Sequence, residues 1–126
     1  MMNDEEKREL RIGPKLQIQW EQKCLHRILD VVARFPKGMR FVLSNRIADL
    51  SVQIACSIHR TRYLKHGSTQ IQHLEDINQH ISMVGMLLRI SHDRKLLSTG
   101  ALEEISRELE VAGNMLGGWK KSCLMK

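Results

Sequence analysis

Apolar residues recur every three or four positions in four long segments of the chain, the spacing that gathers side chains on one face of an α-helix. The pattern predicts helices over residues 13–35, 40–64, 69–92 and 98–121. Proline suits an early helical position, so Gly13-Pro14 is the expected start of the first helix, and Pro36 ends it. Helices of about 22 to 25 residues are each roughly 33 to 38 Å long.

The fourth predicted helix has the most regular pattern. Its apolar positions alternate spacings of three and four residues, as in the seam of a helix packed into a bundle. The seam consists of Leu102, Ile105, Leu109, Ala112, Leu116 and Trp119. We expect Trp119 to be a buried structural anchor, and the preceding Gly117-Gly118 to let a neighbouring helix come close.

Short connections join the four predicted helices, and connections of about four to six residues make sequential helices antiparallel. The sequence therefore predicts an all-α protein, an up-down-up-down antiparallel four-helix bundle. Residues 13–126 form the bundle domain, and residues 1–12 form a flexible N-terminal arm. A chain of 126 residues has room for one such core.

Composition agrees with a helical domain inside the cell. Aromatic residues make up only 4% of the chain, which argues against an all-β fold. The three cysteines include no C-x-x-C pair and indicate reduced thiols. The N-terminus is acidic, unlike a signal peptide, and the longest uncharged apolar stretch, residues 77–88, is too short to cross a bilayer. We therefore expect a cytoplasmic protein with no membrane contact.

The net charge of +6 is concentrated in one quarter of the chain. Residues 1–33 carry six basic and six acidic residues, and residues 67–126 carry seven of each. Residues 34–66 carry seven basic residues against Asp49 alone. Such a cluster favours a polyanionic partner, usually nucleic acid.

A second interpretation of this cluster is that basic residues at helix C-termini offset the helix dipole. That interpretation accounts for Arg34, Arg60 and Arg62. It does not account for Lys37, Arg40 and Arg46, which lie at a predicted helix start, where the dipole disfavours cations.

The predicted topology gathers candidate nucleic-acid-binding residues at both ends of the bundle. One end receives Arg34, Lys37, Arg40, Arg89, Arg94 and Lys95. The opposite end receives Arg60, Arg62, Lys65, Lys120 and Lys121, and Arg46 links the two ends along the second helix. Because no motif offers base-edge readout, we expect salt-sensitive binding of RNA and DNA with low sequence specificity.

No motif in the chain indicates catalysis or a cofactor. The E-x-x-H pairs of di-iron bundles are absent, as are phosphate-loop, nucleophile-elbow and dinucleotide-binding glycine patterns. His73, Asp76 and His80 share a helix at spacings that suit metal ligands, but they lie away from its apolar face. Cys24 and Cys56 lie near apolar stripes and are expected to be small buried hydrophobes. We therefore expect no catalytic residue, no metal and no cofactor.

Several short motifs resemble the accessory variability determinant (Avd) proteins of diversity-generating retroelements, over about residues 16–122. The first of them are Phe35-Pro36-Lys37, Arg40, Arg46-Ile47, Arg62-Tyr63, Leu87-Leu88-Arg89, Asp93, Leu96-Leu97-Ser98 and Gly113. The most specific is Leu116-Gly117-Gly118-Trp119-Lys120-Lys121-Ser122, which is improbable in a generic amphipathic helix.

This resemblance implies a non-catalytic, basic four-helix bundle that assembles into a cyclic homopentameric barrel. It also implies association with the element's reverse transcriptase and binding of nucleic acid during mutagenic retrohoming. Trp20 and Tyr63 lie near predicted helix ends, where exposed aromatic rings would favour self-association. Two alternatives stay open: a stand-alone RNA-binding or scaffolding bundle of the ribosomal-RNA intervening-sequence type, and a metal or cofactor bundle enzyme.

Overall fold

The computed structural model describes residues 1–64 and 67–124, apart from the side chains of residues 5–11, and this part of the chain contains helices and no strand. The first rod, residues 4–32, consists of α1 (Asp4–Ile18), the π-helical segment η1 (Gln19–Leu25) and α2 (His26–Val32). A 3₁₀ turn, η2 (Lys37–Met39), leads into the second rod, residues 40–62, which consists of π-helical η3 (Arg40–Ser44) and α3 (Asn45–Arg62). The third and fourth rods are α4 (Ser68–Asp93) and α5 (Thr99–Leu124).

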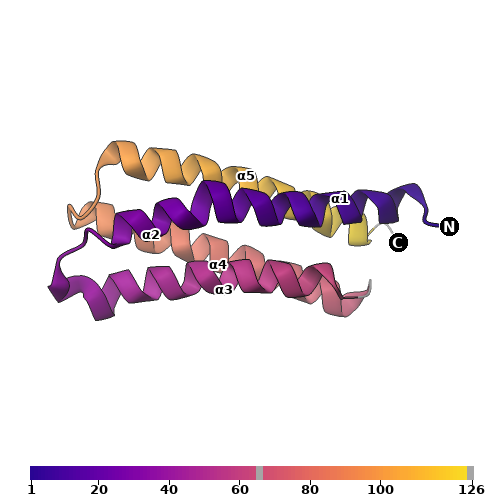
Figure 1. The fold of residues 1–126 in the computed structure, drawn as a ribbon, viewed down its shortest axis with the longest axis horizontal. Helices are drawn as coiled ribbons and strands as arrows, with labels where there is room; N and C mark the ends of the chain where they lie inside the picture. Colours follow the sequence, from indigo (N-terminus) through magenta and orange to yellow (C-terminus); the bar gives the residue numbers. More distant parts are fainter. Residues whose placement is uncertain (65–66, 125–126) are drawn as a thin grey trace.

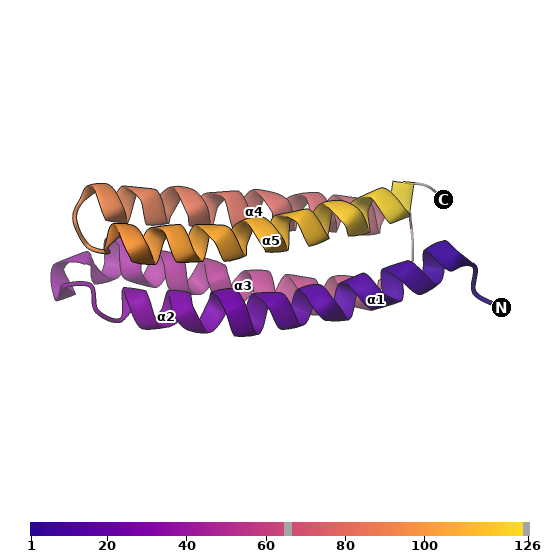
Figure 2. The same ribbon diagram turned by 90° about the horizontal axis from the view of Figure 1, so that it is seen from above.

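Each rod runs antiparallel to the next rod in the chain (Figure 1). α3 packs against α4, α4 packs against α5, and the first rod closes the bundle by packing against both α5 and α3 (Figure 2). The predicted all-α four-helix bundle is therefore confirmed for the single chain. Its assembly into a pentamer stays a prediction.

The two ends of the bundle are built from different parts of the chain (Figures 1 and 2). The α2–α3 and α4–α5 turns meet at one end, which we call the double-turn end and define as residues 33–46 and 89–99. The chain termini, the end of α3 and the start of α4 lie at the other end. We call it the terminal end and define it as residues 12–16, 57–64, 67–75 and 116–124.

The first rod keeps its core residues on one face because it contains a wide turn. Leu16, Trp20, Cys24, Ile28 and Val32 follow one another at spacings of four residues, and all five are buried. In a regular α-helix, at about 100° per residue, a spacing of four drifts by about 40° at each step, so this stripe would wind around the rod. The π-helical η1 has wider turns and removes part of that drift.

The first helix begins earlier than the sequence predicts. α1 starts at Asp4 and continues through Gly13-Pro14 instead of opening there. The early start has a physical reason, because the first residues of the chain are rich in carboxylates, which suit the positive end of the helix dipole. The flexibility of residues 1–12 and the 13–126 domain boundary stay predictions.

A close approach between rods occurs at Gly13, which is buried. A Cβ atom at this position would lie 3.1 Å from Cγ of Arg62 and 3.2 Å from Cη2 of Trp119. Gly117 and Gly118, which were expected to permit a close approach, face open space instead. The indole of Trp119 therefore fills the room that Gly13 leaves on the opposite rod, and the expectation for the two later glycines is wrong.

Both tryptophans are core residues. Trp119 is 1% exposed, as its place on the apolar seam predicts. Trp20 is fully buried, so the prediction of an exposed ring near a helix end is wrong for this residue. Because α1 extends back to Asp4, Trp20 lies in the middle of the first rod, where its indole N–H donates to the carbonyl of Ser51 at 2.9 Å. Tyr63, by contrast, is 72% exposed.

Candidate nucleic-acid interface

The double-turn end brings together basic residues from separate segments of the chain. They are Arg34, Lys37, Arg40 and Arg46 from the α2–α3 turn and the start of the second rod, and Arg89, Arg94 and Lys95 from the end of α4. All seven side chains are exposed. Asp93 is the one acidic residue within the two segments that make up this end. The double-turn end is therefore a strongly positive surface.

These seven side chains make no polar contacts with the side chains or backbone of the described residues. None of them forms an ion pair or a side-chain hydrogen bond with any residue that the structure describes. The carboxylate of Asp93 lies 3.9 Å from Nδ1 of His92, its neighbour on α4, rather than against one of the seven. An exposed cation without a protein partner keeps its charge for a ligand, since no internal contact has to be broken first.

The basic residues predicted for the terminal end stand in a different setting. Nζ of Lys120 lies 3.0 Å from Oε1 of Glu75, in an ion pair that joins α5 to α4. The guanidinium of Arg62 lies 5.7 Å from the centre of the Tyr63 ring, and its Cγ borders the space beside Gly13. Both cations therefore take part in the packing of this end.

Three predicted residues of the terminal end remain. Arg60 is exposed and donates to Oγ of Ser57 at 3.3 Å. Lys121 is exposed and makes no ion pair within the described part of the chain. Lys65 lies outside the described residues. The terminal end thus offers fewer unengaged cations than the double-turn end.

Arg46 is the residue predicted to link the two ends along the second helix. It lies near the start of α3, and Arg60 follows fourteen residues later, which is about 21 Å along a helix. Asp49 is the one acidic residue between them, and no lysine or arginine lies there. Arg46 therefore lies at the double-turn end, and the predicted link through it stays a prediction.

The end of α4 contributes a lysine in an unusual backbone conformation. The N–H of Leu96 donates to the carbonyl of Ser91, and the N–H of Lys95 donates to that of His92, both at 2.9 Å. This pattern is a Schellman motif, whose left-handed position is usually glycine. Lys95 occupies it with φ 64°, where a Cβ atom is strained. Lysine here adds charge to the double-turn end at some expense of stability.

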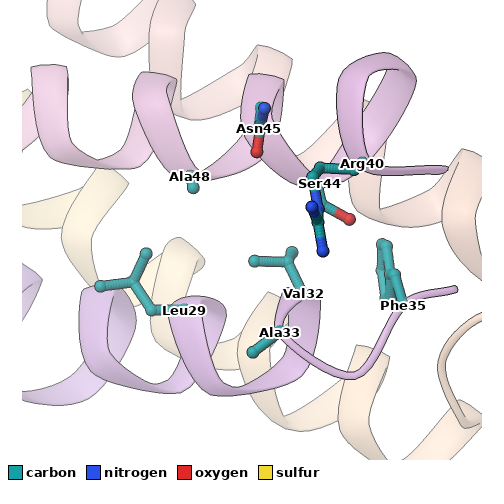
Figure 3. A pocket seen from close by; sticks show the side chains of 8 residues that line it. All are labelled: Leu29, Val32, Ala33, Phe35, Arg40, Ser44, Asn45 and Ala48. Atoms are coloured by element: carbon teal, nitrogen blue, oxygen red, sulfur yellow. The ribbon is translucent and has the colours of Figure 1, made fainter. Parts of the chain in front are cut away.

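A small pocket of about 290 Å³ opens at the double-turn end between α2 and the start of the second rod (Figure 3). Leu29, Val32 and Phe35 form an apolar wall on the side of the first rod. Arg40, Ser44 and Asn45 form a polar wall on the side of the second rod. In Figure 3 the side chain of Arg40 points from the second rod toward the apolar wall.

The polar wall of the pocket depends on the π-helical turn η3. The N–H of Asn45 bonds to the carbonyl of Arg40, five residues earlier, in the wide turn of a π-helix. Arg40 was predicted from the sequence as a binding residue, whereas Ser44 and Asn45 were not. The sequence contains only weak evidence for these two residues, namely a hydroxyl and an amide side chain next to each other among basic residues.

The candidate metal ligands do not gather into a metal site. Within the described part of the chain, no three His, Cys, Asp or Glu side chains come together in a way that could hold a metal ion. His73 and His80 are half-buried on α4, and Asp76 accepts a hydrogen bond from Nε2 of Gln72 at 3.1 Å.

Among the described residues, no helix has an apolar stretch that could span a bilayer.

The two cysteines expected to be buried differ from each other. Cys24 is buried, and burial, with a smaller contribution from the Glu108 carboxylate, raises the pKa of its thiol to about 12. This thiol is therefore protonated at neutral pH. Cys56 is exposed on α3, so its prediction as a buried hydrophobe is wrong. Its position, two residues after the buried Ile54 and two before the buried Ile58, turns it away from the core.

Comparison with known proteins adds a final observation. Neither the curated proteins nor the solved structures contain a significant match to the chain. A family model described as bAvd-like matches residues 15–123, which include most of the first rod and all of the other three up to Cys123. Avd-like proteins are in general accessory and non-catalytic. The match confirms the resemblance drawn from the sequence motifs, and the chain belongs to the bAvd-like family.

Proposed function

We propose that this protein is a non-catalytic, nucleic-acid-binding accessory subunit of a diversity-generating retroelement. In this proposal it associates with the element's reverse transcriptase during mutagenic retrohoming, and the double-turn end is the surface that meets RNA or DNA. Family membership supports the accessory role. The observation that carries nucleic-acid binding is the group of seven exposed basic side chains without ion-pair partners among the described residues.

The physical argument for a polyanion rests on charge density. Seven cations and one carboxylate lie at one end of the bundle, and none of the seven cations forms an ion pair with a described residue. A phosphate backbone releases its bound counterions when it meets such a surface, which makes binding favourable and strongly dependent on salt. All seven side chains are arginine or lysine, whose contacts with phosphates carry no sequence information. Binding therefore tolerates both RNA and DNA.

Self-association belongs to the same proposal, with a cyclic homopentamer as the assembly that the family resemblance implies. Met83, Met86 and Ile90 lie on one exposed face of α4, at spacings of three and four residues. Phe41, at the start of the second rod, is 79% exposed. Large apolar side chains exposed in this way favour contact with another protein surface. A ring of subunits would also repeat the basic end around the symmetry axis.

The experiment is co-purification of the protein with the reverse transcriptase of its own element, with and without nuclease treatment. We expect the two proteins to remain associated after nuclease treatment. Light scattering of the purified protein should give about five times the 14.6 kDa chain mass. Fluorescence anisotropy with labelled RNA and DNA should show affinity that falls steeply as salt rises.

Other outcomes would point elsewhere. RNA binding without any association with the reverse transcriptase would favour the stand-alone bundle of the ribosomal-RNA intervening-sequence type. A chain that binds neither RNA nor DNA at low salt would refute nucleic-acid binding. A mass near that of a single chain at micromolar concentration would refute the pentamer while leaving the binding surface in place.

A further inference from the structure

The pocket of Figure 3 is a cavity whose polar groups are all able to donate hydrogen bonds. The guanidinium of Arg40 has only donors, and the hydroxyl of Ser44 and the amide of Asn45 can donate as well. None of these three side chains has a hydrogen bond or ion pair with a described residue, and no acidic residue lines the pocket. Arg40 therefore requires an occupant that brings acceptors, and an anionic group fits best.

The opposite wall of the pocket imposes a second condition. Leu29, Val32 and Phe35 present hydrocarbon, and Val32 and Phe35 are buried in the core behind it. A hydrated inorganic ion would gain nothing from this wall. An occupant that covers the wall needs an apolar body next to its anionic group, so that both walls are satisfied at once.

The charges around the pocket indicate which kind of anion, a phosphate or a carboxylate, fits best. Arg34, Lys37 and Arg46 lie in the same chain segments as the pocket walls, and all three are exposed and without ion pairs among the described residues. This spread of charge suits a chain of phosphates better than a single carboxylate. In a duplex the bases are stacked and paired, so only an unpaired nucleotide can lay its base against an apolar wall.

We propose that this pocket holds one unpaired nucleotide of a single-stranded RNA or DNA, with its phosphate at Arg40 and its base between the apolar wall and Asn45. This inference rests on the proposed nucleic-acid binding and adds a preference for single strands. The phosphates on either side reach the other basic residues of the double-turn end. Binding at the pocket therefore separates single-stranded from duplex ligands, whereas the surrounding charges bind both.

The test compares a labelled single-stranded oligonucleotide with the same strand annealed to its complement, by fluorescence anisotropy at fixed salt. Arg40→Gln removes a charge inside the pocket, and the matched control Arg94→Gln removes one outside it. Ala33→Leu adds a bulkier side chain at an exposed lining position without changing any charge. Circular dichroism and thermal melting of each variant check that the bundle remains folded.

Arg40→Gln should lower the affinity for the single strand about tenfold, the loss expected for one hydrogen bond to a charged group, and should affect the duplex much less. Ala33→Leu should lower single-strand affinity alone. Arg94→Gln should lower the affinity for the single strand and for the duplex by the same factor.

The proposal is overturned if Arg40→Gln and Arg94→Gln weaken both ligands to the same extent while Ala33→Leu changes nothing. In that case the basic surface still binds and the proposed function stands. It is also overturned if Ala33→Leu spares both oligonucleotides but abolishes association with the reverse transcriptase, because the pocket then holds protein. Failure of the unchanged protein to bind either oligonucleotide would instead refute the proposed function.

Discussion

The two ends of the bundle carry similar kinds of residues in different settings. At the double-turn end, seven basic side chains are exposed and have no partner among the described residues. At the terminal end, Lys120 pairs with Glu75, and Arg62 packs beside Tyr63 and Gly13. The availability of a charge for a ligand therefore depends on its neighbours, which a count of lysines and arginines does not reveal.

The ends also differ in how tightly they are packed. The terminal end contains a buried tryptophan against a buried glycine, with contacts near 3.2 Å for a Cβ placed at Gly13. The double-turn end contains an open pocket and Lys95 in a strained conformation. Features that lower stability and features that offer contacts to a ligand therefore occur at the same end, as is common at binding sites.

The largest expected effect is on stability at the terminal end. Trp119→Ala removes a fully buried indole and should lower the free energy of unfolding by about 3 to 5 kcal/mol. Thermal and urea unfolding measure the change. Trp119→Phe is the control: it keeps one aromatic ring and leaves a smaller cavity than alanine does, and the indole N–H that it removes has no partner among the described residues, so its effect should be smaller. An unchanged melting temperature together with lost nucleic-acid binding would mean that the ring stacks on bases.

The next effect is on nucleic-acid binding, and it should differ between variants of the two ends. Replacing Arg34, Lys37 and Arg40 with Gln should lower the salt slope of binding by about 2 to 3, and the affinity at low salt roughly a hundredfold, since each phosphate contact adds about 0.7 to 0.9 to the slope. The matched variant replaces Arg60, Arg62 and Lys65 with Gln, and its affinity and salt slope should fall much less. Anisotropy titrations at several salt concentrations measure both. Equal losses of affinity from the two variants would mean that the cations of both ends are equally available to nucleic acid.

A smaller effect on stability has opposite signs at two glycines. Gly13→Ala places a Cβ about 3.1 to 3.2 Å from Arg62 and Trp119, and the crowding should destabilise the protein by about 1 to 3 kcal/mol. Gly118→Ala introduces the same methyl group at an exposed position in α5 and should stabilise it by about 0.5 to 1 kcal/mol. Paired unfolding curves test this directly, and a stabilising Gly13→Ala would disprove the close approach.

The smallest effect concerns the strained lysine of the double-turn end. Lys95→Gly relieves the left-handed backbone and should raise stability by about 1 kcal/mol. It also removes one of the seven charges, so the salt slope should fall by about 0.7 to 0.9. Lys95→Asn, which tolerates the same backbone, serves as a second uncharged variant. A higher melting temperature with an unchanged salt slope would place Lys95 outside the nucleic-acid surface.

Much of the fold was predictable because it depends on short-range patterns. Apolar spacings of three and four predicted the helices and placed Trp119 in the core, and the short connections made neighbouring helices antiparallel. The start of the first helix was wrong, since the Gly13-Pro14 pair resembles a helix opening, although α1 passes through it. The misplaced start in turn made Trp20 look like a residue near a helix end.

The candidate site was predictable only in part. The basic segment and the gathering of Arg34, Lys37 and Arg40 with the end of α4 follow from the topology. The predicted link through Arg46 stays a prediction, since about 21 Å of helix separate this residue from Arg60. Ser44 and Asn45 were not predicted from the sequence, because they form a pocket wall only through the π-helical turn η3.

The helical pattern, the antiparallel order and the position of the excess charge along the chain follow from the sequence, because each depends on residues close together in sequence. The tertiary structure was needed to show which cations are engaged, which glycine permits a close approach and where a pocket opens. These features depend on distances between rods, such as the 3.0 Å between Lys120 and Glu75. No periodicity encodes such distances, since they result from the packing of all four rods together.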